Sequence, residues 1–362
     1  MRLVRCMKKI FILVFLFIIN VFCFAKSRYS IFVYEGKVGL INENLDIVLN
    51  PEFDFIELYE DYLLARKLYG STFVYDYELK VIYEMKSRCD FNALSKDFCV
   101  FSTSKDDFIL DVNTGKIETT KLLFAPQRLA IKENETKYIA GQWKYYSSDL
   151  KTEYFTDKAY WAVYPFNNDR GIVMYDAMAF AIVDSDLNFI RTDISDCAEM
   201  YSENLIAIKT ADGKSGFADT TGQFVFYCDF YKDESDYAPK AMATLNYYFR
   251  DGFVCVQGKS KKWFIFDIEG NSIEIGNGLN MENTLSSEGF FLVSRNNGGK
   301  KQFGFINQKG EEIIPCRFDS AANYCNDFAR VIINGKKGVI DKNGNLYYSE
   351  DLIKGIKKTM AY

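Results

Sequence analysis

The chain has 362 residues, of which 48% are hydrophobic and 17% aromatic, and its formal net charge is −5. It contains no histidine, which excludes Ser-His-Asp and Cys-His catalysis and every metal site that uses imidazole. The acidic balance also disfavours nucleic acid as a partner, because binding to phosphate backbones needs clustered basic charge.

The first 25 residues have the features of a secretory signal peptide. Four basic residues precede an almost wholly apolar run from 10 to 22, and Cys23-Phe24-Ala25 then suits cleavage before Lys26. The apolar run is shorter than the ~20 residues that a membrane span needs. We therefore expect export to the periplasm or the cell surface, with no transmembrane span after cleavage. Lipidation at Cys23 is the alternative, although Phe22 fits that modification poorly.

A short pattern recurs nine times between residues 28 and 350. Each copy is a β-rich run that ends in an anchor residue, usually Asp or Asn, followed by a tight turn and a second β-rich run. A unit of this kind cannot bury its own apolar face, so it must stack on its neighbours. Two of the anchors, Val112 and Ser147, are placed partly by the spacing. The anchors are Asn42, Asp76, Val112, Ser147, Asp184, Asp219, Asp267, Asn307 and Asp341.

The residue three positions after the anchor takes two forms, and both predict a hairpin turn. Glycine supplies the positive φ that tight hairpins need, and Asn or Asp tolerates it next best. We expect the anchor carboxylates to cap the turn backbone rather than to take part in catalysis. The glycine form has Gly115, Gly222, Gly270, Gly310 and Gly344, and the other form has Leu45, Leu79, Leu150 and Leu187.

Each unit holds three or four short strands, with turn signals every 8–12 residues or so. The chain has 32 Phe and 25 Tyr but only 5 Pro, so the sequence predicts an all-β repeat domain over 28–350 and a basic tail over 351–362. A β-propeller of eight or nine small blades is favoured, because closure removes exposed sheet edges. A β-solenoid is the alternative. The first unit lacks leading strands, which a C-terminal strand could supply.

These residues resemble the WG-repeat proteins of bacteria, whose motif runs loosely Trp/Tyr-Gly-Phe-Ile-Asp, then Val-Ile-Pro and Tyr-Asp. The best match is Phe303-Gly304-Phe305-Ile306-Asn307 with Pro315 and Phe318-Asp319. A second is Val38-Gly39-Leu40-Ile41-Asn42 with Pro51 and Phe53-Asp54, and a third includes Gly216 and Asp219. The tryptophan is missing from each of these copies. The resemblance implies a repeat fold and little mechanism.

Seven cysteines remain after residue 25, an odd number that leaves at least one unpaired within the chain. Three of them, Cys89, Cys228 and Cys316, follow hairpins in a related position and are interpreted as core residues. Pairing of Cys89 with Cys99, or of Cys316 with Cys325, is the alternative.

The sequence predicts no catalytic, cofactor or metal site. Asp184-Ser185-Asp186-Leu187-Asn188 imitates the start of a calcium loop, but Phe189 stands where such loops need Gly and Ser195 where they need Glu. There is no Cys-x-x-Cys pair and no phosphate-binding loop.

Two insertions interrupt the repeat, one between Asp219 and Asp267 and a shorter one, Arg295 to Lys301, between Asp267 and Asn307. Insertions in repeat folds often form binding loops, and a tolerated surface excursion is the alternative interpretation. The candidate binding residues of the longer insertion are Lys232, Asp233, Glu234, Asp236 and Tyr237.

The sequence as a whole favours an exported, non-catalytic binding or scaffold protein of the bacterial cell envelope, whose partner is a protein or an envelope glycan. The alternative is a glycan-binding or glycan-hydrolysing β-propeller, because glycoside hydrolysis needs only two carboxylates. A purely structural envelope protein is a third hypothesis.

Overall fold

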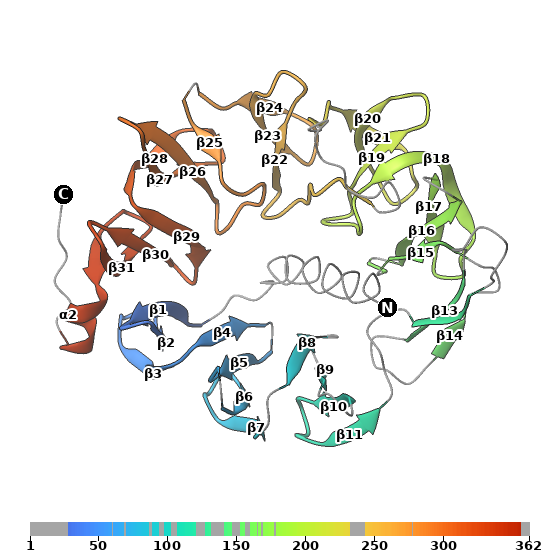
Figure 1. Cartoon of the computed structure of the whole chain (residues 1–362). Helices are drawn as coiled ribbons and strands as arrows, with labels where there is room; N and C mark the ends of the chain where they lie inside the picture. Colours follow the sequence, from blue (N-terminus) through green and yellow to red (C-terminus); the bar gives the residue numbers. More distant parts are fainter. Residues whose placement is uncertain are drawn as a thin grey trace, which may run out of the picture. The chain divides into compact units, whose positions relative to one another are not determined.

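A computed structural model gives the structure of the chain. It describes residues 28–59, 61–68, 70–86, 89–93, 98–102, 107–120, 127–131, 141–146, 153–155, 160–164, 166–167, 169–176, 179–231, 243–276 and 278–355. These residues form a succession of small antiparallel sheets with one short helix, α2 (Figure 1). The prediction of an all-β repeat chain is confirmed.

The chain divides into two compact units. Unit 1 consists of Met1–Lys121 and Ser349–Lys357, and unit 2 consists of Leu122–Tyr348 and Lys358–Tyr362.

Unit 1 contains three sheets among its described residues. The first has β1 (Ser30–Tyr34), β2 (Lys37–Ile41) and β3 (Ile47–Phe53). The second has β4 (Phe55–Leu58), β5 (Leu63–Arg66), β6 (Thr72–Tyr75) and β7 (Val81–Met85). The third has β8 (Asp90–Ala93), β9 (Phe98–Ser102), β10 (Asp107–Asp111) and β11 (Ile117–Thr120). Helix α2 (Ser349–Ile353) lies against β1.

Unit 2 contains the remaining sheets. The first has β12 (Gln127–Ile131), β13 (Gly141–Tyr146) and β14 (Glu153–Phe155). A seven-stranded sheet has β15 (Ala162–Val163), β16 (Arg170–Asp176), β17 (Ala179–Asp184), β18 (Phe189–Cys197), β19 (Ile206–Thr210), β20 (Ser215–Ala218) and β21 (Phe224–Tyr227). The next has β22 (Phe253–Gln257), β23 (Trp263–Asp267) and β24 (Ser272–Glu274).

Two four-stranded sheets complete unit 2. One has β25 (Asn280–Met281), β26 (Phe290–Asn297), β27 (Lys300–Asn307) and β28 (Glu312–Phe318). The other has β29 (Ser320–Cys325), β30 (Phe328–Ile333), β31 (Lys336–Asp341) and β32 (Leu346–Tyr348).

At several junctions, the last strand of one repeat leads directly into the first strand of the next. The start of β18 pairs with β17 and its end pairs with β19, so this one strand serves two repeats. At two other junctions a single aspartate separates the two strands, Asp54 between β3 and β4 and Asp319 between β28 and β29. The predicted stacking of repeats follows from this direct connection.

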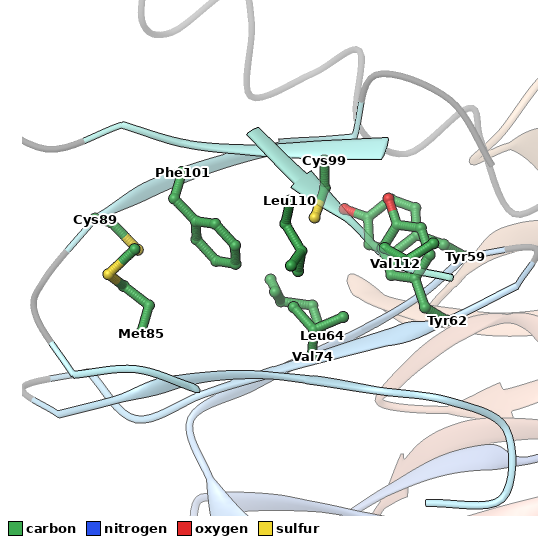
Figure 2. Close-up of a cluster of buried hydrophobic side chains, with 10 residues drawn as sticks. All are labelled: Tyr59, Tyr62, Leu64, Val74, Met85, Cys89, Cys99, Phe101, Leu110 and Val112. Carbon is green, nitrogen blue, oxygen red and sulfur yellow. The ribbon is translucent and has the colours of Figure 1, made fainter. Parts of the chain in front are cut away.

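The hydrophobic core lies between consecutive sheets. In unit 1, Leu64 and Val74 of the second sheet pack against Phe101 and Leu110 of the third (Figure 2). In unit 2, Phe305 of β27 packs in the same cluster as Tyr324 of β29, and the ring centroids of these two residues are 4.8 Å apart. Each sheet therefore supplies half of a core to its neighbour, as expected for a repeat fold.

The seven cysteines after residue 25 are free thiols. Cys89 and Cys316 are buried, which agrees with the interpretation as core residues, whereas Cys228 is half-buried. Burial raises the pKa of both the Cys228 and the Cys316 thiol to about 12, so both stay protonated at neutral pH and are poor nucleophiles.

The C-terminal strand that could complete the first sheet is replaced by a helix. The first sheet has three strands, and the segment that returns to β1 is α2.

Candidate functional site

The seven Asp and Asn anchors that the structure describes hold their turns in one common way. At Asp184, Oδ1 accepts the backbone N–H groups of Asp186 and Asn188 at 3.0 and 2.8 Å. The Asn188 side chain donates to the other oxygen, and these hydrogen bonds lower the pKa of Asp184. Side chains committed to the turn backbone are poorly placed for catalysis. The same two backbone hydrogen bonds occur at Asn42, Asp76, Asp219, Asp267, Asn307 and Asp341.

The anchor predicted at Val112 was wrong by one residue. Asp111 caps this turn, accepting the N–H groups of Asn113 and Thr114 at 2.9 and 3.2 Å, while Val112 is buried in the core. This turn is one residue longer than the others, because Gly115 donates to the Asp111 carbonyl from four positions on. Spacing alone could not reveal the extra residue. Ser147 lies outside the described residues.

The residue three positions after the anchor has positive φ in both predicted forms. Leu45, Leu79 and Leu187 have φ of 63°, 61° and 64°, close to the 73° of Gly310. A leucine in this conformation costs roughly 1–2 kcal/mol. Leu45 is buried, so its contacts with the core offset the strain there.

A second set of turns in unit 2 connects consecutive repeats through hydrogen bonds from one turn to the next. We call this set the turn row. These four two-residue turns have positive φ at both central residues, the geometry that suits tight hairpins. They lie between Ser202 and Leu205, Arg250 and Phe253, Ser287 and Phe290, and Cys325 and Phe328.

A carboxylate in each of the first three turns accepts a backbone N–H of the next turn. Glu203 Oε2 accepts from Gly252 at 2.9 Å, Asp251 Oδ2 from Gly289 at 3.4 Å, and Glu288 Oε2 from Asp327 at 2.9 Å. Partial desolvation of its carboxylate raises the pKa of Glu203. The turn row therefore fixes each repeat to the next.

The anchor turns lie at the same end of the sheets as the turn row. The hydroxyl of Tyr201 donates to the Asp219 carbonyl at 3.0 Å, and that of Tyr324 to the Asp341 carbonyl at 2.9 Å. Burial raises the pKa of both tyrosines. This end of unit 2 is consequently crowded with acidic side chains that hold backbone groups.

The opposite strand ends of unit 2 carry lysines, and we call this surface the lysine rim. It comprises the hairpins at 258–262, 298–301 and 334–337, which connect β22 to β23, β26 to β27 and β30 to β31. The last two hairpins are neighbours, because both contact Asp319: Lys300 pairs with one carboxylate oxygen, and Gly335 N–H donates to the other at 3.2 Å. The lysines of the rim are Lys259, Lys261, Lys262, Lys300, Lys301, Lys336 and Lys337.

Four of these lysines form ion pairs with other described residues. Lys259 pairs with Asp229, Lys262 with Glu274, Lys300 with Asp319 and Lys301 with Glu282. Lys261 lies 5.3 Å from the ring centroid of Tyr231, and Lys336 lies 5.4 Å from that of Tyr348. Within the described part of the chain, neither of these two nor Lys337 has an ion-pair partner. Counted over the described residues, the rim thus carries excess positive charge on a chain whose net charge is negative.

The predicted binding loop lies outside the described residues, from Lys232 through Asp233, Glu234 and Asp236 to Tyr237. Tyr231, the last described residue before it, donates its N–H to the Gln257 carbonyl at 2.7 Å, next to the lysine rim. On the other side, Asp196 accepts the N–H of Thr244 at 2.9 Å and its hydroxyl at 2.5 Å.

Unit 1 has a shallow depression of about 390 Å³, lined by Lys37, Asp54, Lys67, Leu68 and Gly70. Asp54 pairs with Lys37 at 2.8 Å and accepts the Leu68 N–H at 2.8 Å, and Lys37 lowers the pKa of this carboxyl. These are the same contacts that Asp319 makes in unit 2. The depression is therefore part of the junction between two repeats and not a dedicated ligand pocket.

Neither metal ligands nor a membrane-crossing helix were found where the structure is described. No cluster of three Cys, Asp or Glu side chains there could hold a metal ion. No helix there is long and apolar enough to cross a membrane.

The recurring glycine of the two best motif copies is required by close backbone approach. A Cβ on Gly304 would lie 2.5 Å from the Ile314 carbonyl oxygen, and one on Gly39 would lie 2.6 Å from that of Leu49. In both places the outer strand shifts its register opposite the glycine. The sequence profile of the WG containing repeat matches residues 39–67 and 303–336, which include these two glycines. These two segments of the chain thus match the WG containing repeat. Within the second matched segment, Gly304 lets adjacent strands approach closely, and Asp319 joins consecutive repeats.

One solved structure supports the all-β, propeller-like fold of this chain. The crystal structure of a eukaryotic initiation factor matches with a TM-score of 0.50 and 11% identity, covering 89% of this chain and 96% of that one. BamB from Moraxella catarrhalis matches with a TM-score of 0.42 and 13% identity, covering 80% of this chain and 94% of that one. No curated protein sequence matches the chain. These identities carry information on the fold alone.

Sequence reasoning missed the turn row, and of the lysine rim it singled out only the insertion that ends in Lys300 and Lys301. The turn row does have a sequence signal. An acidic residue or Asn is followed by Gly, Asn or Asp shortly before β19, β22, β26 and β30, as in Glu288-Gly289 and Asn326-Asp327. The lysine rim as a whole has no such signal, because its three hairpins are brought together only by the stacking of the repeats.

Proposed function

We propose that this chain is an exported, non-catalytic binding protein of the bacterial cell envelope, and that its partner docks on the lysine rim. Export is supported by the basic and apolar segment at residues 1–25. The single observation that carries the binding site is the row of seven lysines on three successive hairpins at one end of unit 2, of which Lys261, Lys336 and Lys337 have no ion-pair partner among the described residues.

The charge of the rim selects the chemistry of the partner. Positive charge concentrated on one surface of an acidic protein attracts an anionic partner and repels a cationic one. Lys261 and Lys336 lie beside the rings of Tyr231 and Tyr348, and aromatic rings contribute apolar contact area at binding surfaces. An acidic protein surface and an acidic envelope glycan both fit this chemistry, and the experiment distinguishes them.

A non-catalytic role is supported by how the acidic residues are used. The anchor carboxylates accept backbone hydrogen bonds within their turns, and the turn-row carboxylates accept them across repeats. Hydrolysis of a glycan would need two carboxylates that are free to face the substrate.

The test is a pull-down from envelope extract, with separate arms for protein and for acidic polysaccharide, using two double variants of equal charge change. Lys261→Glu with Lys337→Glu reverses charge on the lysine rim, whereas Lys80→Glu with Lys309→Glu reverses it at two exposed anchor-turn lysines. We expect the first variant to lose most retention in one arm and the second to behave as wild type. Equal retention by both variants, or loss by both, would contradict the proposed site.

A further inference from the structure

Strand β1 lies at the edge of the first sheet and contacts the C-terminal helix. The strand order is β1-β2-β3, so one side of β1 has no strand neighbour within its sheet. Helix α2 lies against β1 and belongs to unit 1, although β32 immediately before it belongs to unit 2. The chain thus ends by returning to the strand with which its described part begins.

The docked helix is held by apolar burial. Leu352 is 4% exposed and Ser349 is 2% exposed, whereas the adjacent Ile353 is 38% exposed. Glu350 pairs with Lys354 at 2.9 Å on the outer surface of the helix. A five-residue helix is too short to be stable alone in water, so its structure depends on its contact with β1.

The sequence of β1 explains why an edge at this position needs a cover. It reads Ser-Ile-Phe-Val-Tyr, with no charge and no proline. Natural edge strands avoid pairing with other molecules by carrying Lys or Pro, by bulging, or by being covered. Short, uncharged runs of β-branched and aromatic residues are the ones that self-associate most readily when exposed. Because β1 has neither a charged residue nor proline, protection of this edge depends on the segment that packs against it.

We propose that residues 349–355 form an intramolecular cap that keeps β1 from pairing with β1 of a second copy of the chain. Ile31 and Val33 are half-buried on either side of the buried Phe32, so an uncovered β1 would offer apolar side chains at a sheet edge. Loss of the cap is expected to convert a monomer into a strand-paired dimer or larger species.

The test compares Leu352→Asp with Ile353→Asp in the chain from Lys26 onward, the form expected after signal cleavage. Both changes introduce one aspartate into the same helix, but only Leu352 is buried. We expect Leu352→Asp to self-associate with rising concentration in sedimentation experiments, and Ile353→Asp to match wild type. We expect amide exchange of residues 30–34 to rise by at least about tenfold in dilute Leu352→Asp, with the remaining sheets unchanged.

A second change assigns the association to β1. Adding Val33→Lys to Leu352→Asp places a charge on the exposed edge and is expected to restore the monomer. A Leu352→Asp protein that stays monomeric with unchanged exchange at 30–34 would overturn the proposal, as would association that Val33→Lys leaves intact. Should Leu352→Asp unfold the whole chain, the proposal is tested by Ser349→Ala instead. That change removes a buried hydroxyl without a hydrogen-bond partner and is expected to slow exchange at 30–34, and unchanged or faster exchange would overturn the proposal.

Discussion

Glu288 accepts the backbone N–H of Asp327 at 2.9 Å, so a side chain in one repeat caps a turn in the next. Lys342 pairs with the carboxylates of both residues. The same arrangement joins Glu203 to Gly252 and Asp251 to Gly289. Because this contact recurs at three successive junctions between repeats, it is a property of the repeat and not of one site.

Replacing Glu288 by Ala should therefore weaken the connection between the last two sheets. We expect a loss of about 1–2 kcal/mol in the free energy of unfolding, since a hydrogen bond to a charged acceptor is removed. Amide exchange at residues 326–328 should rise more than exchange elsewhere. Glu269→Ala, at an exposed position in the Asp267 turn, is the control and should change neither quantity. Equal effects of the two substitutions would show that the turn row does not couple repeats.

Gly304→Ala should be strongly destabilising, because the added Cβ would meet the Ile314 carbonyl oxygen at 2.5 Å. Overpacking of this kind costs roughly 1–3 kcal/mol. Gly276→Ala is the matched control, since no atom lies within 4 Å of its Cβ position and its φ is not positive. Urea unfolding of the two variants tests this prediction, and a Gly304→Ala protein as stable as Gly276→Ala would disprove the steric explanation of the motif glycine.

The leucines with positive φ should respond to glycine according to their burial. Leu45→Gly relieves the backbone strain but removes a buried side chain, so we expect a net loss of about 1–2 kcal/mol in unfolding free energy. Leu79 is half-buried, and Leu79→Gly should be close to neutral because strain relief and lost contacts offset each other. Thermal or urea unfolding measures the difference, and a larger loss at Leu79 than at Leu45 would contradict this explanation.

Asp319 should make part of the stability depend on pH. Lys300 and the Gly335 N–H lower the pKa of Asp319 in the folded chain. A carboxyl with a lowered folded pKa contributes stability above its unfolded pKa of about 3.9, and this contribution is lost as pH falls through the folded value. The urea midpoint of wild type should therefore fall below about pH 4 more steeply than that of Asp319→Asn. If the urea midpoints of the two proteins fell equally steeply with pH, Asp319 would not be a source of the pH dependence.

The sequence was sufficient for the repeat, the all-β class and the anchor turns, because each depends on residues close together in the chain. Asp184 and Asn188, for instance, form a turn that local chemistry dictates. Asp111 escaped prediction because its turn has one additional residue, which changes the spacing. The contact between Glu288 and Asp327 and the lysine rim depend on how repeats stack. Helix α2 could not be foreseen either, since five residues carry no periodicity.

The most direct test of the proposed function is site-specific photo-crosslinking in envelope extract. The crosslinking residue replaces Lys337 on the lysine rim in one protein and Lys309 on an anchor turn in the other. The account predicts a specific adduct, to a protein or to an acidic glycan, from position 337 and none from position 309. An adduct from position 309 alone, or the same adducts from both positions, would contradict binding at the lysine rim.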